Sequence, residues 1–130
     1  MVAATRQFKE LREASLQRVV RITAWSLAAT IVVLSLVPSE LRPETGVRHN
    51  LEHFFAFAAT GAAFGLGYEA RRGLREIRLI IFAGTVEIAQ LFVPGRHARL
   101  SDFIVDAIAI SVASIAGSLI KHMFTCFGYR

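Results

Sequence analysis

Four runs of apolar residues, separated by short polar connections, constrain this chain of 130 residues most strongly. The runs cover residues 19–37, 51–68, 79–93 and 103–124. A helix of 19 residues is about 28 Å long, which is close to the hydrocarbon thickness of a bilayer. With 54% hydrophobic residues and a mean hydropathy of +0.48, the chain is also more apolar than a typical soluble domain. The sequence therefore predicts an all-α, four-helix transmembrane bundle with short loops.

Residues 1–18 mix basic and acidic side chains with a loose apolar stripe. This pattern predicts a separate N-terminal interfacial helix, followed by a membrane domain over residues 19–130. A charged start before an apolar run is also typical of a secretory signal, but no small-residue cleavage site follows Leu36 and three more apolar runs come later. We therefore expect the first run to be retained as a helix.

Lysine and arginine residues are distributed unevenly over the connections. Eleven of the 15 lie in residues 1–21, 71–78 and 121–130, whereas the other four lie in residues 42–48 and 96–99. Because cytoplasmic connections carry an excess of basic residues, this bias predicts a multi-pass protein of the cytoplasmic (inner) membrane with both termini cytoplasmic. The net charge of +5 would also suit nucleic acid. Short basic clusters between apolar runs favour the topological interpretation, so we expect no nucleic-acid binding.

Ionisable and amide side chains occur inside or beside the last two apolar runs. Glu87 and Gln90 lie three residues apart, and Asp102 and Asp106 lie four apart, so each pair shares one face of a helix. A carboxylate in hydrocarbon costs on the order of 3 kcal/mol unless it is neutral, paired or beside water. Arg96 lies in the connection between the two runs and can pair with a carboxylate or a phosphate. We therefore expect these side chains to meet in the outer half of the membrane.

Structural roles compete with functional ones for the same residues. Ser101 and Asp102 also fit the N-cap and the dipole-complementing first turn of the fourth helix. Glu87 and Asp106 also fit hydrogen bonds or ion pairs that hold helices together, and Gln90 fits a hydrogen bond between helices. Both interpretations stay open at the level of the sequence.

Small residues occur at helical spacing in the second and fourth runs. Gly61 and Gly65 form a small-xxx-small pair, which lets a neighbouring backbone approach closely, although glycine is also simply common in membrane helices. The fourth run carries a second set of small residues at this spacing: Ala107, Ser111, Ser114 and Ser118. This set is a plausible close-packing stripe.

His49 to His53 reads His-Asn-Leu-Glu-His, which matches the His-x-x-Glu-His pattern of one class of zinc peptidases. Asn50 fits the N-cap of the second helix, which would leave His49 outside that helix and away from His53. No downstream glutamate arrangement completes a zinc site. We therefore expect no metal and no other cofactor, and we interpret His53 as a hydrogen-bond partner of a carboxylate in the third or fourth helix.

Several short elements occur in a fixed order over residues 47–117: His53-Phe54, Glu87-x-x-Gln90, Pro94-Gly95-Arg96, Ser101-Asp102 and a polar residue at position 106. Their order and spacing resemble the VanZ-like membrane proteins, a family named for an accessory protein of teicoplanin resistance. By resemblance, the polar positions of the family are His53, Glu87, Gln90, Arg96 and Asp102.

This sequence departs from the family pattern at three places. His49-Asn50 stands where an acidic residue and a lysine often precede the family histidine, and Asp106 stands where an asparagine is expected. Ala109 replaces an expected glycine. The missing lysine removes one partner for a phosphate or a carboxylate, and Asp106 adds negative charge.

The favoured function is an outward-facing polar pocket that binds a lipid headgroup or a lipid-linked cell-envelope precursor, with a link to tolerance of glycopeptides such as teicoplanin. The ligand-binding residues we expect are His53, Glu87, Gln90, Arg96, Asp102 and Asp106. One alternative is a membrane enzyme in which Glu87 or His53 acts as general acid or base on a lipid-linked substrate. Another is a structural or assembly partner of a second membrane protein. A transporter is disfavoured because the ionisable residues occupy one half of the membrane.

Overall fold

Four α-helices make up the described part of the chain, which comprises residues 2–38, 49–69, 71–94 and 99–127 of a computed structural model. In chain order they are α1 (Val2–Leu36), α2 (His49–Gly67), α3 (Arg72–Gln90) and α4 (Leu100–Phe127). These ranges contain no strand, which confirms the all-α prediction.

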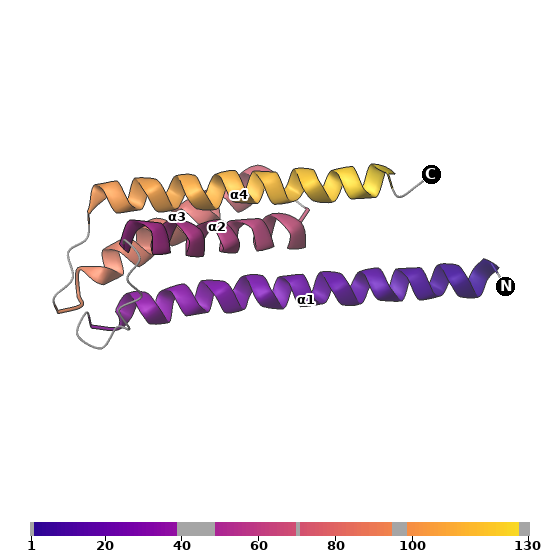
Figure 1. Cartoon of the computed structure of the whole chain (residues 1–130), viewed down its shortest axis with the longest axis horizontal. Coiled ribbons are helices and arrows are strands. Elements are labelled where there is room, and N and C mark those ends of the chain that lie inside the picture. Colours follow the sequence, from indigo (N-terminus) through magenta and orange to yellow (C-terminus); the bar gives the residue numbers. More distant parts are fainter. Residues whose placement is uncertain (1, 39–48, 70, 95–98, 128–130) are drawn as a thin grey trace.

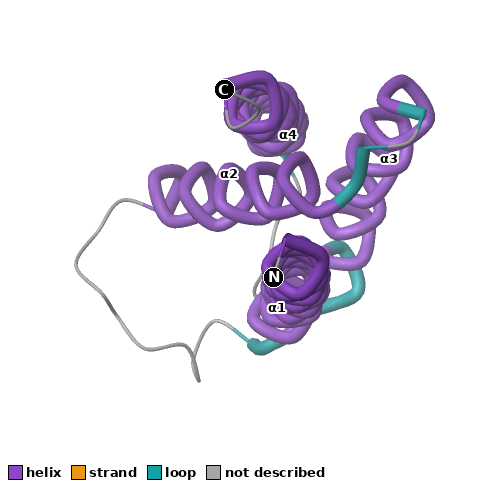
Figure 2. Tube along the Cα trace, turned by 90° about the vertical axis from the view of Figure 1, so that its right-hand side faces the viewer, coloured by secondary structure: helices purple, strands orange, loops and turns teal. Residues whose placement is uncertain are grey.

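The helices form an elongated bundle in which α1 and α4 run along the long axis (Figure 1). Both termini lie at the same end of this axis. Seen along it, α2 lies between α1 and α4, and α3 lies to one side (Figure 2). The helix α2 makes its most extensive contact with α4, and α3 contacts both α4 and α1. Residues from α2, α3 and α4 can therefore meet inside the bundle.

The predicted separate helix over residues 1–18 is wrong, because α1 continues unbroken from Val2 to Leu36. Its sequence contains neither proline nor glycine, so no residue interrupts the hydrogen-bond ladder. The helix ends before Pro38, as expected for the residues that precede a proline. The charged N-terminal residues are thus an extension of the first apolar helix.

The third helix also begins earlier than predicted, at Arg72 rather than at Leu79. The arginines that suggested an exposed basic connection, Arg75 and Arg78 among them, lie on the first turns of α3. Arginine and glutamate are good helix formers, and the charge of this stretch concealed that propensity.

Two of the helices are long and apolar enough to cross a membrane within the described residues. These are the segments Glu10–Leu36 of α1 and Leu100–Cys126 of α4. Only 22% and 33% of the residues in their apolar 18-residue stretches are buried, whereas the core helix of a soluble protein is mostly buried. Helices near an N-terminus can also be signal sequences, so these two segments are a weak indication of a membrane protein.

Every helix exposes apolar side chains on the outward surface of the bundle. Large hydrophobic side chains are exposed on all four, for example Ile22, Phe55, Ile81 and Val112. Several polar side chains are instead buried inside, as described below. An apolar exterior around buried polar groups is the pattern expected of a chain in lipid rather than in water.

The helices α2 and α4 pack backbone to backbone. A Cβ atom added at Gly61 or Gly65 would collide with the backbone carbonyl groups of Ile110 and Ser114 on α4. A Cβ atom at Gly117 would lie 2.6 Å from a carbonyl oxygen of α2. The close-packing role predicted for the two glycines of α2 is therefore confirmed.

Replacing Gly61 by alanine should lower the free energy of unfolding by about 1–3 kcal/mol, because the added methyl group forces the two helices apart. Gly73→Ala is the matched control, since no atom lies within 4 Å of a Cβ added there and alanine favours a helix. Thermal denaturation in detergent measures both variants. Equal melting temperatures for the two would contradict the contact.

Candidate functional site

His53 and Asp106 form a buried pair between α2 and α4. The Nδ1 atom of His53 lies 3.0 Å from Oδ2 of Asp106, and the two side chains are only 6% and 1% exposed. An ionised carboxylate only accepts hydrogen bonds, so Nδ1–H is the donor whenever Asp106 is ionised. The prediction that His53 is the partner of a carboxylate in the third or fourth helix is confirmed.

Glu87 brings α3 into the same region. Its side chain is buried, and Oε1 accepts a hydrogen bond from the backbone N–H of Arg99, with a distance of 2.6 Å. Because Arg99 directly precedes α4, this bond ties the start of α4 to α3. Glu87 also interacts electrostatically with Asp102, Asp106 and His53. The expected convergence of the second, third and fourth helices is therefore present.

Asp102 lies one turn before Asp106 and is partly buried. It is in the first turn of α4, where a carboxylate complements the helix dipole. Ser101 is inside that turn because α4 begins at Leu100, and its hydroxyl donates to Oδ1 of Asp102 at 3.0 Å. The predicted N-cap role of Ser101 is therefore wrong, whereas the dipole role of Asp102 agrees with its position.

Gln90 is also buried and lies one turn after Glu87, at the end of α3. We call His53, Glu87, Gln90, Asp102 and Asp106 the acid–histidine cluster. Three of its buried atoms have no hydrogen-bond partner among the described residues: Oε2 of Glu87, Oδ1 of Asp106 and Nε2 of Gln90. Two of these atoms are acceptors and one is a donor. The cluster therefore offers two acceptors and one donor to a further group, so it is suited mainly to a ligand that donates hydrogen bonds.

Two sequence expectations about this site concern neighbouring residues. Arg96 lies outside the described residues. The helix α2 begins at His49, so the predicted N-cap at Asn50 is wrong. Among the residues that the structure describes, no group of three His, Cys, Asp or Glu side chains is arranged to hold a metal ion.

No family model, curated protein or solved structure matches this chain. The resemblance of residues 47–117 to VanZ-like proteins therefore rests on the motif residues themselves. Of these, His53, Glu87, Gln90 and Asp102 lie in the acid–histidine cluster.

The bundle contains a second polar network, which sequence reasoning missed. Arg75 is only 8% exposed, and its guanidinium donates to the carbonyl oxygen of Tyr68 at 2.6 Å, to Oγ of Ser118 at 2.7 Å and to Oε1 of Glu76 at 2.8 Å. The same glutamate oxygen accepts from Oγ of Ser114 at 2.9 Å. We call Arg75, Glu76, Ser114 and Ser118 the arginine network.

The two polar regions lie apart along the bundle. On α4, Asp106 and Ser114 are eight residues from each other, which is about 12 Å along a helix. Apolar residues lie between the two regions, including Phe57, Leu79 and Ile110 of the core. Buried polar side chains therefore occur in both halves of the bundle, whereas the argument against a transporter assumed that they occur in one half only. An apolar layer separates the two polar regions.

Proposed function

We propose that the chain is a four-span protein of the cytoplasmic (inner) membrane, with both termini cytoplasmic. The apolar exterior of all four helices supports this proposal. So does the position of the two termini at one end of the bundle, which an even number of spans requires (Figure 1). The bias of 11 against four basic residues then assigns that end to the cytoplasm.

We further propose that the acid–histidine cluster binds the headgroup of a lipid or of a lipid-linked cell-envelope precursor. The observation that carries this proposal is a pair of buried carboxylate oxygens, Oε2 of Glu87 and Oδ1 of Asp106, for which the described part of the chain provides no hydrogen-bond partner. Leaving such acceptors unpaired in a low-dielectric interior is costly, and a ligand that donates hydrogen bonds removes the cost. Hydroxyl groups of a sugar or polyol, or an ammonium group, supply such donors.

The remaining groups fit a headgroup of mixed character. Nε2 of Gln90 can donate to an oxygen of the same ligand. Arg96 follows the Pro94-Gly95 turn in the sequence, and a guanidinium there suits the phosphate of a lipid-linked precursor. The resemblance to VanZ-like proteins supports an envelope ligand and a link to glycopeptide tolerance.

Glu87→Gln should weaken ligand retention by about tenfold or more, since it replaces an acceptor for a charge-assisted hydrogen bond by an amide. The amide oxygen can still accept from the N–H of Arg99, so the fold should persist. Native mass spectrometry of the detergent-purified protein measures the lipid that stays bound. Glu13→Gln, an exposed position on α1, is the matched control. Identical lipid retention by the two variants at equal stability would refute the assignment of Glu87.

An enzyme is the second candidate, favoured by the hydrogen bond between His53 and Asp106. A carboxylate that holds one imidazole nitrogen fixes the orientation of the other, which suits the histidine to general acid–base chemistry. Incubation with lipid extract distinguishes the two functions. A lipid whose mass changes with the wild-type protein but not with His53→Gln indicates turnover, whereas unchanged lipid masses indicate binding alone.

A further inference from the structure

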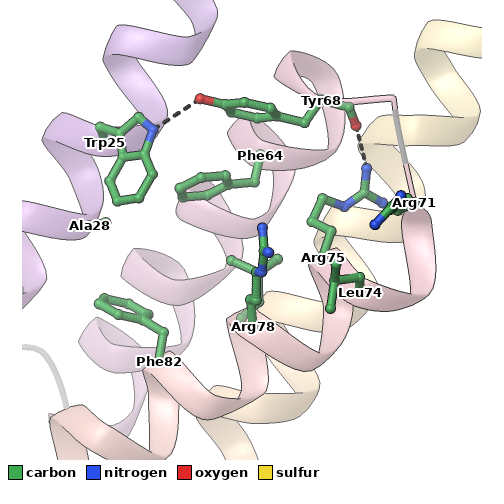
Figure 3. A pocket seen from close by; sticks show the side chains of 10 residues that line it. Trp25, Ala28, Phe64, Tyr68, Arg71, Leu74, Arg75, Arg78 and Phe82 are labelled. Carbon is green, nitrogen blue, oxygen red and sulfur yellow. Dashed lines mark hydrogen bonds between the residues drawn. The ribbon is translucent and has the colours of Figure 1, made fainter.

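A groove of about 490 Å³ lies between α1, the end of α2 and the start of α3. This volume is within the range of roughly 300–1,000 Å³ that is typical of sites for small organic ligands. None of its lining residues belongs to the acid–histidine cluster. Figure 3 shows aromatic side chains from the three helices around it, with arginines of the α3 side along its edge. The groove is thus apolar along its walls and basic at one margin.

Aromatic contacts fix the wall formed by α1 and α2. Nε1–H of Trp25 donates to the hydroxyl of Tyr68 at 2.9 Å, and the Trp25 ring meets Phe64 edge to face with centroids 5.4 Å apart (Figure 3). Phe64 in turn stacks on Tyr68, with ring centroids 5.7 Å apart. Tryptophan and tyrosine are enriched where hydrocarbon meets the polar headgroups. This wall is therefore suited to the region just below the headgroups.

The three arginines of the groove differ in their partners. Arg75 is committed to the arginine network. The side chains of Arg71 and Arg78 are exposed, and neither makes a hydrogen bond or an ion pair within the described residues. Arg71 precedes α3 with a φ of 51°, a left-handed backbone conformation that is uncommon for a residue other than glycine. Two guanidinium groups therefore remain available beside an apolar cavity.

We propose that this groove binds an anionic phospholipid from the leaflet on the side of the two termini. An acyl chain occupies the space between Trp25, Phe64 and Phe82, and the phosphate is held by Arg71 and Arg78. Guanidinium groups bind phosphate oxygens in bidentate fashion, which gives the charge complementarity. A small soluble anion would leave the apolar walls empty, so a lipid is the better match. The inference rests on the membrane part of the proposed function and not on any ligand of the acid–histidine cluster.

The test is a titration of the detergent-purified full chain with phosphatidylglycerol or phosphatidylcholine of identical acyl chains, followed by native mass spectrometry. We expect a preference for phosphatidylglycerol of about fivefold or more, since one arginine near an anionic lipid surface has an effect of about that size. The double variant Arg71→Gln/Arg78→Gln should lose the preference. The control Arg12→Gln/Arg18→Gln, which removes the same charge from exposed positions of α1 outside the groove, should keep it.

Three results would overturn the inference. Equal binding of the two lipids would remove the selectivity for an anionic lipid, and an unchanged preference in the Arg71→Gln/Arg78→Gln variant would remove the role of the arginines. Competition by water-soluble glycerol phosphate at similar concentration would indicate a site for free anions. The variant Ala28→Phe narrows the groove. If the wild type formed a dimer and showed no lipid preference, and if Ala28→Phe abolished that dimer, the groove would be occupied by a second copy of the chain.

Failure of this inference can be distinguished from failure of the proposed function. Glu87→Gln changes the acid–histidine cluster alone, so it should leave the preference for phosphatidylglycerol intact. Fractionation of cells that produce the chain tests the shared premise. Recovery of the chain in the soluble fraction would overturn both the membrane assignment and the groove, whereas a membrane-bound chain without lipid preference would overturn the groove only.

Discussion

Replacing Arg75 by methionine is expected to destabilise the protein by about 3–5 kcal/mol, the range for removal of one partner from a buried ion pair. The guanidinium of Arg75 donates hydrogen bonds to the neighbouring Glu76 and to two groups elsewhere in the chain, Oγ of Ser118 and the carbonyl oxygen of Tyr68. Its loss leaves the carboxylate of Glu76 mostly buried without its cation. Thermal and chemical denaturation in detergent measure the effect.

Two further variants make this prediction specific. Arg72→Met removes the same type of side chain from an exposed position on the same helix, and it should cost less than about 0.5 kcal/mol. Arg75→Met/Glu76→Gln removes both charges and should recover part of the lost stability, because no unpaired ion is left inside. If Arg75→Met and Arg72→Met were equally stable, the arginine network would not contribute to the fold.

The second large effect is expected at Asp106. Asp106→Ala should cost about 1.5–3 kcal/mol, the range for loss of a buried hydrogen bond to a charged group, since it leaves the ring of His53 without the carboxylate oxygen at 3.0 Å. Asp106→Asn keeps an oxygen that accepts from Nδ1–H, and asparagine is the residue that the family resemblance leads one to expect there. We therefore expect Asp106→Asn to remain within about 1 kcal/mol of the wild type.

The same pair of variants separates a structural role from a ligand-binding role. If Asp106 only holds the helices together, Asp106→Asn should retain both stability and bound lipid. If Oδ1 also accepts from a ligand, Asp106→Asn should be stable but should retain less lipid in native mass spectrometry. An Asp106→Ala variant as stable as Asp106→Asn would show that the contact with His53 does not hold α2 to α4.

Much of the fold could be predicted because its signals are local. The length of the apolar runs indicates four helices, and the spacing of Gly61 and Gly65 predicted a close approach of a neighbouring backbone, which the structure shows to be that of α4. The errors occurred where charge concealed helix propensity. Residues 1–18 and 71–78 suggested separate or irregular segments, yet they contain mostly good helix formers and belong to α1 and α3.

The candidate site could be predicted in composition but not in pairing. The helical spacing of Glu87, Asp102 and Asp106 predicted that they face inward. The free-energy cost of a charged side chain in hydrocarbon predicted that they lie near one another. That His53 would pair with Asp106, while Glu87 accepts from the backbone of Arg99, depends on how the connections fold. The burial of Arg75 was missed because arginines between apolar runs usually face water, and its partners come from distant parts of the sequence.

The glycine contact between α2 and α4 has a consequence for motion. Since only hydrogen atoms separate the two backbones at Gly61 and Gly65, neither helix can slide or rotate against the other without collision. His53 and Asp106 are therefore held on two closely packed backbones, whereas Glu87 on α3 is joined to the start of α4 through its hydrogen bond with the N–H of Arg99. A movement of α3 away from α4 therefore has to break the hydrogen bond between Glu87 and Arg99, while the pair of His53 and Asp106 can stay intact.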